Sequence, residues 1–323
     1  MWPKISVIVP VRPGVPVPAV AALQCAAYAP DQLEILIVEG NCPSRQRNCG
    51  ARQASGDILY FLDDDSLIAP DALRRIALHY DASDVHAVGG PSLTPDGEPL
   101  LSHCIGYALG TRLGAWTMRA RYAPTGRYRP ATEKEVIGCN LSIRRLTFEA
   151  LGGFREDLFP NEETELTSRL LSNGYSLMYD PDLVVRRAQR RSLADLARQF
   201  FAYGRGRLRQ MARTFSRSAV IFLAPTIGLA YLLWWPILGW TLGAWTTLPF
   251  ALYGGLVFST SIYLSLTRRT VAGLVIFPIL FVLIHVCYGC GLIYEGLRQL
   301  SKRMLNRWVR RRAKSKAYSA APR

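Results

Sequence analysis

Two common nucleotide-binding signatures are missing from this sequence. The turns after its predicted strands contain neither a Gly-x-Gly-x-x-Gly run nor a P-loop pattern, which counts against a dinucleotide-dependent oxidoreductase and a P-loop enzyme. Zinc-ligand spacing is also missing among the cysteines, apart from Cys287-x-x-Cys290. That pair lies in an apolar stretch whose glycines favour close helix packing. We therefore expect reduced structural thiols and no zinc site.

Charged residues are scarce from Ala219 to near the C-terminus. Three apolar stretches, at 219–240, 248–266 and 271–294, each approach the ~20 residues that cross a bilayer. The sequence therefore predicts two or three transmembrane helices. Arg268 and Arg269 fit a cytoplasmic loop after two crossings. The third stretch then is re-entrant, lies in the interface, or crosses against the positive-inside tendency.

The N-terminus shows no secretory signal, because Lys4 is the only charge before an apolar strand at 5–10. We expect a multi-pass protein of the inner cell membrane whose soluble domain faces the cytoplasm. The expected organisation is a soluble domain at 1–185, a basic amphipathic interfacial segment at 186–217, a membrane region at 218–296 and a basic tail at 297–323.

The formal net charge of +15 is concentrated beside the membrane region. One basic cluster lies at 186–217 and another at 298–316, where anionic headgroups attract Lys and Arg. Aromatic residues do not interleave these clusters as they would in a base-stacking surface. The expected partners are membrane lipids, and no nucleic acid partner is expected.

Strands and helices alternate in the soluble part. We predict strands at 5–10, 34–39 and 57–62, with helices at 17–29 and 44–54 between them. This order is typical of an α/β domain with a parallel, doubly wound sheet. Ligands of such sheets bind beyond the carboxyl ends of the strands. Pro10, Val11 and Glu39 lie at such ends, as do the carboxylates described next.

Three carboxylates, Asp63, Asp64 and Asp65, directly follow the apolar strand. Adjacent carboxylates repel one another, so this run requires a positive partner. The strand's period of two places Asp63 and Asp65 on one side, where Mg²⁺ or Mn²⁺ would accept oxygen ligands. The alternative is an acidic turn in which Ser66 and Asp71 cap a helix at 72–79.

The motifs of the soluble part, taken in order, resemble the inverting family 2 glycosyltransferases, which have the GT-A fold. Each motif alone is a weak signal, whereas the ordered set is specific. The matching segments are 5–10, 35–40, 47–51, 56–65, 138–145, 151–154 and 161–166, the last followed by Arg169 and Leu170.

This resemblance implies a nucleotide-diphosphate sugar as donor and Mg²⁺ or Mn²⁺ as cofactor. Glu39 would contact the base, and Asp65 with Asp63 would hold the metal that neutralises the departing nucleoside diphosphate. The residues that the resemblance assigns to the nucleotide sugar are Pro10, Val11, Glu39, Arg47, Asp63 and Asp64.

The resemblance also places the general base at Glu163, with Glu162 beside it. The family more often has Asp where this chain has Glu39 and Glu163, which leaves the choice between Glu162 and Glu163 open. Glu165 nearby could raise a pKa in this cluster. The alternative is an ordinary acidic helix start, with the leucines at 166, 170 and 171 on a core face.

A third region follows at Gln189-Arg190-Arg191-Ser192-Leu193 and continues as an amphipathic helix. Processive synthases of the family have Gln-x-x-Arg-Trp here, and this chain lacks the tryptophan. The region instead resembles a segment of membrane-bound exopolysaccharide glycosyltransferases. Either the arginines anchor the chain to headgroups, or they bind a lipid diphosphate. The acceptor or lipid-phosphate candidates are Asn140, Gln189, Arg190, Arg191, Arg205 and Arg207.

The sequence therefore predicts a membrane-bound, metal-dependent, inverting glycosyltransferase that acts on a lipid-linked acceptor in cell-surface polysaccharide or glycolipid synthesis. Two related alternatives are a polyprenyl-phosphate sugar synthase and a processive polysaccharide synthase. An alternative of another class is a non-catalytic membrane scaffold that retains the nucleotide-binding fold.

Overall fold

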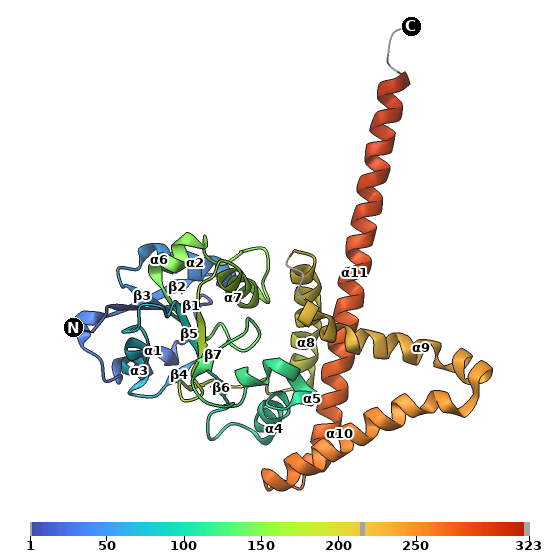
Figure 1. The fold of residues 1–323 in the computed structure, drawn as a ribbon, viewed down its shortest axis with the longest axis horizontal. Helices are drawn as coiled ribbons and strands as arrows, with labels where there is room; N and C mark the ends of the chain where they lie inside the picture. Colours follow the sequence, from blue (N-terminus) through green and yellow to red (C-terminus); the bar gives the residue numbers. More distant parts are fainter. Residues whose placement is uncertain (1, 214–216, 320–323) are drawn as a thin grey trace. The chain divides into compact units, whose positions relative to one another are not determined.

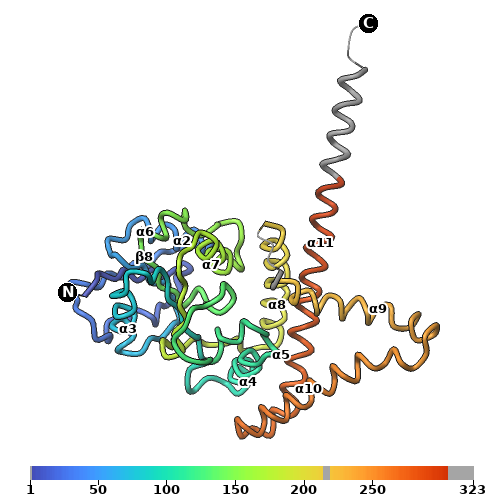
Figure 2. Tube along the Cα trace, viewed as in Figure 1, coloured from blue at the N-terminus to red at the C-terminus, as the bar shows by residue number. Residues whose placement is uncertain are grey.

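The computed structural model describes residues 2–213 and 217–319 (Figure 1). Figure 2 traces the path of the chain from the N-terminus to the C-terminus. Residues 214–216 of the expected interfacial segment and 320–323 of the expected tail lie outside this part. The chain divides into two compact units. The first comprises Met1–Leu196 and Thr247–Leu283, and the second comprises Ala197–Thr246 and Ile284–Arg323. Each unit is described by itself.

The first unit is built on a seven-stranded sheet in the order β2-β1-β3-β8-β5-β9-β7. Strand β1 (Ile5–Val11) pairs in parallel with β2 (Leu33–Glu39) and with β3 (Ile58–Leu62). The three strands predicted from the sequence are therefore present and parallel. Their carboxyl ends share one edge, because Val11 lies opposite Glu39 and Ile8 lies opposite Phe61.

The rest of the sheet is mixed, whereas the sequence predicted a parallel sheet. Strand β8 (Asn140–Arg144) runs antiparallel to both β3 and β5 (Ala87–Gly89). Strand β9 (Leu177–Tyr179) is parallel to β5, and β7 (Arg129–Pro130) is antiparallel to β9. The strict strand-helix alternation on which a parallel sheet depends ends after β3, since several helices follow one another before β8.

Those helices are α4 (Leu100–Leu109), α5 (Arg112–Ala115) and the 3₁₀ helix η2 (Trp116–Arg121). A separate three-stranded sheet has the order β4-β10-β6, with β4 at Leu67–Ile68, β10 at Val185–Arg186 and β6 at Ser92–Leu93. The backbone of Arg187 extends the pairing of β10 with β6, because its amide donates to the Leu93 carbonyl oxygen at 2.8 Å. The small sheet therefore fixes the chain on either side of β10.

Helices cover both faces of the large sheet (Figure 1). On one face α2 (Pro43–Gln53), α6 (Arg145–Ala150) and α7 (Glu162–Ser172) bury Ile8, Leu59 and Phe61. On the other face α1 (Pro18–Gln24) and α3 (Ala72–His79) bury Ile5, Val7 and Tyr60. The alternation follows from the period of two along each strand. With both faces covered, the ends of the strands remain for a site.

Helix α1 is shorter than the predicted helix at 17–29. It ends at Gln24, and the amide of Ala27 then donates to the carbonyl oxygen of Pro70 at 2.7 Å. This contact draws the chain out of the helical path before the short 3₁₀ helix η1 (Pro30–Gln32) begins. A tertiary hydrogen bond of this kind leaves no local signal in the sequence.

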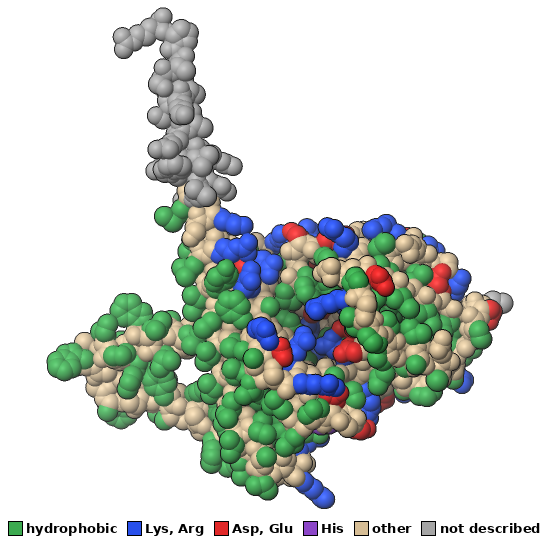
Figure 3. Space-filling model, turned by 180° about the vertical axis from the view of Figure 1, so that it is seen from behind, with side chains coloured by type: hydrophobic (Ala, Val, Ile, Leu, Met, Phe, Trp, Pro, Cys, Tyr) green, Lys and Arg blue, Asp and Glu red, His purple; other side chains and the backbone are tan. Residues whose placement is uncertain are grey.

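The apolar stretches form helices α9 (Ala224–Leu242), α10 (Leu248–Thr267) and the first part of α11 (Gly273–Ser319). A 3₁₀ helix, η3 (Arg217–Leu223), precedes α9, and η4 (Gly243–Thr247) links α9 to α10. Two stretches, Ala219–Thr267 and Gly273–Met304, are long and apolar enough to cross a membrane, judged by length and composition alone. Large hydrophobic side chains are exposed along these helices (Figure 3).

The predicted amphipathic helix is α8 (Leu193–Met211). Ser192 caps its start, because the Ser192 Oγ accepts from the Asp195 amide at 3.1 Å and donates to the Asp195 carboxylate at 2.6 Å. All seven cysteines are free thiols in this structure.

Candidate active site

A buried arginine, Arg47 on α2, joins the two acidic motifs. Its Nη2 lies 2.8 Å from Oδ1 of Asp63, directly after β3, and its Nη1 lies 2.7 Å from Oε1 of Glu162, at the start of α7. Two acidic residues that are 99 positions apart in sequence therefore meet at one guanidinium. Arg47 thus holds Asp63 and Glu162, two of the carboxylates predicted from the sequence, close to each other.

A second arginine, Arg187, pairs with the other carboxylate oxygen of Asp63. Burial alone would raise the pKa of Asp63, but the positive charges of Arg187 and Arg47 hold it below its usual range. Asp63 is therefore an anion locked between two cations. Sequence reasoning did not single out Arg187, because nothing in the basic run around it distinguishes one arginine from the next.

The turn after Asp63 fixes the other two carboxylates. Ser66 Oγ accepts from the Asp63 amide at 3.2 Å, and the Asp64 carbonyl oxygen accepts from the Ala19 amide at 3.1 Å. Loss of surrounding water, together with the charges of Asp63 and Asp64, raises the pKa of Asp65 to about 6. Such crowding is relieved when a cation binds. Asp71, the alternative helix cap, makes no side-chain capping bond.

A divalent cation fits this run of carboxylates. Within the described residues, no three His, Cys, Asp or Glu side chains are grouped so as to form a protein-only metal cage. Mg²⁺ commonly uses one or two carboxylates and completes its coordination with water and substrate phosphates. Both oxygens of Asp63 are held by arginines, whereas Asp65 is exposed at the surface. Asp65 is thus the more open ligand.

A third arginine, Arg121 in η2, holds Glu163. Its Nη1 lies 2.8 Å from Glu163 Oε1, while its Nε donates to the Lys134 carbonyl oxygen at 2.7 Å and its Nη2 to Thr164 Oγ1 at 2.9 Å. Arg121 is itself buried, so this geometry is fixed. Sequence reasoning missed Arg121, which lies in a loop region without a recognisable motif.

The two candidate bases differ in their surroundings. The side chain of Glu162 is only 4% exposed, whereas that of Glu163 is 14% exposed. Burial, and then the neighbouring Glu163 carboxylate, raises the pKa of Glu162 above its usual range against the opposing charge of Arg47. Glu162 is therefore enclosed under Arg47, while Glu163 is the more exposed of the two carboxylates.

Glu165 has a different role from the one that the sequence suggested. Its carboxylate is bound by Arg169, with contacts of 3.1 and 2.7 Å, and by Arg155 at 3.0 Å. Arg169 also donates to the Gly153 carbonyl oxygen at 2.8 Å and to that of Leu151. The charge of Glu165 is thus balanced, and the network ties α7 to the segment before it.

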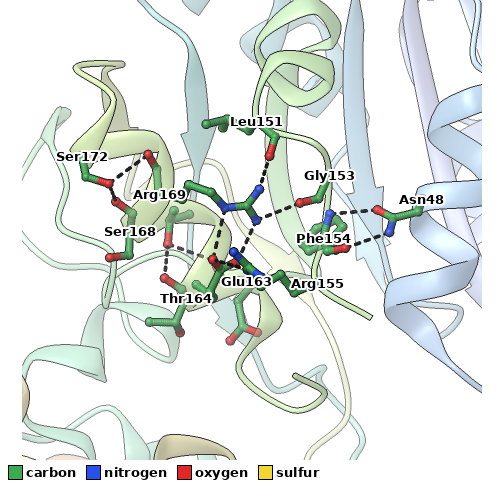
Figure 4. A network of polar contacts seen from close by, with 12 residues as sticks. Asn48, Leu151, Gly153, Phe154, Arg155, Glu163, Thr164, Ser168, Arg169 and Ser172 are labelled. Carbon is green, nitrogen blue, oxygen red and sulfur yellow. Dashed lines mark hydrogen bonds and ion pairs between the residues drawn. The ribbon is translucent and has the colours of Figure 1, made fainter. Parts of the chain in front are cut away.

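Asn48 secures the same segment to α2. Its Nδ2 donates to the Phe154 carbonyl oxygen at 2.8 Å, and its Oδ1 accepts from the Phe154 amide at 2.8 Å (Figure 4). Asn48 directly follows Arg47 in the chain. This two-bond clamp holds α2 in place where Arg47 reaches the acidic groups.

The other nucleotide-sugar candidates lie at the ends of β1 and β2. Pro10 and Val11 are buried, and Glu39 is exposed at the end of the edge strand β2. Gln46 Nε2 donates to the carbonyl oxygens of Val11 at 2.8 Å and Val38 at 2.6 Å. Gln46, which sequence reasoning did not select, fixes the backbone beside Glu39.

Asn140, an acceptor candidate, lies inside the sheet. Its Oδ1 accepts from the Tyr60 hydroxyl at 2.9 Å, and its Nδ2 donates to the carbonyl oxygens of Pro91 at 3.2 Å and Leu183 at 2.6 Å. All of these partners are structural. None of these partners is another of the acceptor candidates.

The basic candidates are spread along the chain. Gln189 is buried, the Arg190 carbonyl oxygen accepts from Ser102 Oγ at 3.2 Å, and Arg191 pairs with Glu98 at 2.9 Å. In the second unit, Arg205 pairs with Glu295 at 3.4 Å. Arg207 is buried there, with its guanidinium 4.5 Å from the centre of the Phe222 ring.

Three comparisons with known proteins bear on this site. A family model described as glycosyl transferase family group 2 matches residues 58–294. A solved mannosyltransferase, PcManGT from Pyrobaculum calidifontis in complex with GDP-Man and Mn²⁺, is similar with a TM-score of 0.60 and 16% identity, covering 91% of this chain and 87% of that chain. At this identity the likeness shows a shared fold.

A second solved structure, TarS from S. aureus, matches with a TM-score of 0.44 and 14% identity, covering 68% of this chain and 42% of that chain. A likeness at this level carries no argument about the site. The comparison with curated protein sequences found no match.

Proposed function

This chain belongs to glycosyl transferase family group 2 and has the GT-A fold, and on that basis we propose that it transfers a sugar from a nucleotide-diphosphate sugar to a lipid-linked, polyprenyl-type acceptor. The observation that carries the proposal is the meeting of the Asp63–65 run and the Glu162-Glu163 pair at Arg47. A donor site and a base are thereby supplied at one edge of the sheet.

The donor lies across the carboxyl ends of β1, β2 and β3. Glu39 contacts the base, the backbone of Pro10 and Val11 borders it, and Asp63 and Asp64 face the ribose and diphosphate. Arg47 keeps Asp63 oriented through their 2.8 Å ion pair. The GDP-Man bound to the similar mannosyltransferase supports a nucleotide sugar as the donor class.

Asp65, with Asp63, would hold Mg²⁺ or Mn²⁺, and the bound ion would offset charge on the departing nucleoside diphosphate. The crowding that raises the pKa of Asp65 supports this assignment. The Mn²⁺ in the similar mannosyltransferase supports the use of a divalent cation.

Glu163 is the general base. Arg121 holds its Oε1, so that its Oε2 takes the proton from the acceptor hydroxyl as that hydroxyl attacks the anomeric carbon. Attack from the face opposite the leaving group inverts the anomeric configuration. Glu162 positions Arg47 instead, because its buried carboxylate forms an ion pair with the Arg47 guanidinium.

The acceptor comes from the membrane. The exposed apolar helices support a membrane region at 218–296. In this proposal the soluble domain at 1–185 lies on the cytoplasmic side. The basic segment at 186–217 joins the two, and Gln189, Arg190, Arg191, Arg205 and Arg207 are its acceptor-side candidates.

The test is sugar transfer from a panel of radiolabelled nucleotide sugars into organic-extractable lipid, with detergent-purified protein and Mn²⁺ or Mg²⁺. We expect label in the lipid from one donor, and an anomeric configuration opposite to that of the donor by NMR. Asp65→Asn should lower transfer by about a hundredfold or more because it removes a metal ligand. Asp71→Asn, an exposed position on the same segment, is the matched control and should retain activity.

Metal-dependent nucleotide binding without transfer to any lipid would overturn the proposal in favour of a non-catalytic scaffold. Transfer with retained configuration would overturn the inverting mechanism while leaving the glycosyltransferase assignment intact.

A further inference from the structure

Helices α8 and α11 touch backbone to backbone within the second unit. A Cβ added at Gly204 of α8 would lie 2.1 Å from the Tyr288 carbonyl oxygen, and one added at Gly291 of α11 would lie 2.1 Å from the Phe201 carbonyl oxygen. Only glycine permits this approach. The side chains that follow these glycines are therefore held close together from both helices.

One of them, Glu295, is a buried carboxylate surrounded by arginines. Arg205 Nε lies 3.4 Å from it, Arg298 Nη1 lies 3.5 Å from it, and Arg209 Nε lies 4.0 Å from it. Three positively charged side chains face one carboxylate, which leaves a local excess of two positive charges. Such an excess in a partly desolvated place favours binding of an anion.

The arginines present unused donors. Arg205 and Arg209 face Glu295 through Nε, and within the described residues their terminal amino groups have no hydrogen-bond partner. Loss of water and the neighbouring Arg205, Arg298 and Arg213 lower the pKa of Arg209. The side chains of Arg205, Arg209 and Arg298 are 31%, 25% and 42% exposed, so a ligand can reach them.

The cluster formed by Glu295 and its three arginines lies where α11 changes from apolar to charged residues. The helix is apolar from Gly273 to Tyr294 and then carries Glu295, Arg298, Lys302 and Arg303 in quick succession. Arg205 also lies 5.1 Å from the centre of the Tyr294 ring. An aromatic side chain and arginines at the end of an apolar helix are typical of the headgroup level of a bilayer.

We propose that Arg205, Arg209 and Arg298 bind the phosphate end of one lipid-linked acceptor chain. A guanidinium binds phosphate through two parallel hydrogen bonds, and its terminal amino groups suit that contact. This inference deepens the proposed function and rests on it for the identity of the lipid. It differs from the sequence-based candidates, because Arg209 and Arg298 replace the buried Arg207.

The test is binding of radiolabelled farnesyl phosphate to the full-length protein in dodecyl maltoside micelles, without any sugar donor. Arg209→Gln should weaken binding about tenfold, and Arg209→Lys should also weaken it because lysine keeps the charge without the planar fork. Lys302→Gln is the matched control. Lys302 is exposed about one turn beyond Arg298 on α11, and its loss should change affinity less than about twofold.

Competition identifies the source of the phosphate. Unlabelled farnesyl phosphate should displace the label, whereas phosphatidylglycerol in the same micelles and inorganic phosphate should not. Equal displacement by phosphatidylglycerol, or equal losses in Lys302→Gln and Arg209→Gln, would overturn the proposal in favour of diffuse headgroup attraction. Unchanged binding in Arg209→Lys would exclude the bidentate contact.

The outcomes also separate this inference from the proposed function. Loss of lipid binding in Arg209→Gln without sugar transfer by the wild type would refute the enzyme and leave the phosphate site. Sugar transfer by the wild type with normal lipid binding in both Arg209 variants would refute the phosphate site alone. The melting temperature of each variant, compared with the wild type, identifies any that misfolds.

Discussion

At the scale of single residues, Asp63 is held by Arg47 on one oxygen and Arg187 on the other. A metal that uses Asp63 must compete with these guanidinium groups for the same carboxylate. Arg47 is buried and also binds Glu162. Moving it away from Asp63 would therefore leave a second buried carboxylate without its positive partner. Arg187 is the partner that a cation can displace at lower cost.

We therefore predict that Arg187→Gln strengthens Mn²⁺ binding in the absence of nucleotide by up to about tenfold, because a competing and repelling charge is lost. The amount of free Mn²⁺ measured by electron paramagnetic resonance gives the affinity. Arg186→Gln is the matched control, since Arg186 is exposed and lies 3.5 Å from Asp96 instead. Weaker Mn²⁺ binding in Arg187→Gln would show that Arg187 supports the metal site.

Asp180, outside the active site, stabilises the fold. It accepts from Arg75 at 3.1 Å, from the Asp182 amide at 2.9 Å and lies 2.7 Å from His79 Nε2. Burial acts to raise its pKa, but these hydrogen bonds and the charge of Arg75 lower it to about 2. The folded state therefore favours the anion by roughly 2 kcal/mol at pH 7.

Because the folded pKa is depressed, this stabilisation is present above about pH 4 and is lost as the pH falls towards 2. Asp180→Asn should lower the melting temperature at pH 7, and its difference from the wild type should shrink below pH 4. Asp182→Asn, on a side chain that is 72% exposed, should have little effect. A difference that stays constant from pH 7 to pH 3 would contradict this account.

Only some of the individual residues of the candidate site could be predicted from the sequence. The sequence singles out Asp63 to Asp65 as an acidic run after an apolar strand, and the resemblance to the family singles out Glu162 and Glu163. Arg121 and Arg187 were missed because each acquires its role only when the fold brings it to a carboxylate distant in the chain. Another arginine lies close to each of them in sequence, Arg119 near Arg121 and Arg186 beside Arg187, so no pattern separated them.

At the scale of elements, β1, β2 and β3 were predictable because each is a short apolar run closed by polar or turn-forming residues. The antiparallel course of β8 was not, since strand direction depends on how the intervening α4, α5 and η2 return the chain to the sheet. The early end of α1 likewise depends on the tertiary hydrogen bond from Ala27 to Pro70.

The crossing of α8 and α11 gives a prediction at this scale. Gly291→Ala should destabilise the protein by about 1–3 kcal/mol, because the new Cβ would lie 2.1 Å from the Phe201 carbonyl oxygen and the helices must separate. Gly255→Ala on α10 is the matched control, since nothing lies within 4 Å of its added Cβ. Melting of the detergent-purified variants provides the measurement, and equal melting temperatures would contradict the close crossing.

At the scale of the whole molecule, the chain combines a catalytic domain with exposed apolar helices and a strong positive charge. The apolar stretches were predictable because length and hydrophobicity suffice to recognise them. The ion-pair cluster of Glu295 was not, since it needs two helices that are distant in sequence. Together these parts fit an enzyme whose donor is water-soluble and whose acceptor is a membrane lipid.

The most direct measurement of the central claim compares wild type and Glu163→Gln for donor binding and for single-turnover sugar transfer to lipid. We predict donor affinity within about threefold of wild type and a transfer rate lower by about 10²–10⁴, because only the general base is removed. Glu149→Gln, 52% exposed on α6, should match the wild type in both. Transfer by Glu163→Gln at the wild-type rate would contradict the assignment of Glu163 as the base.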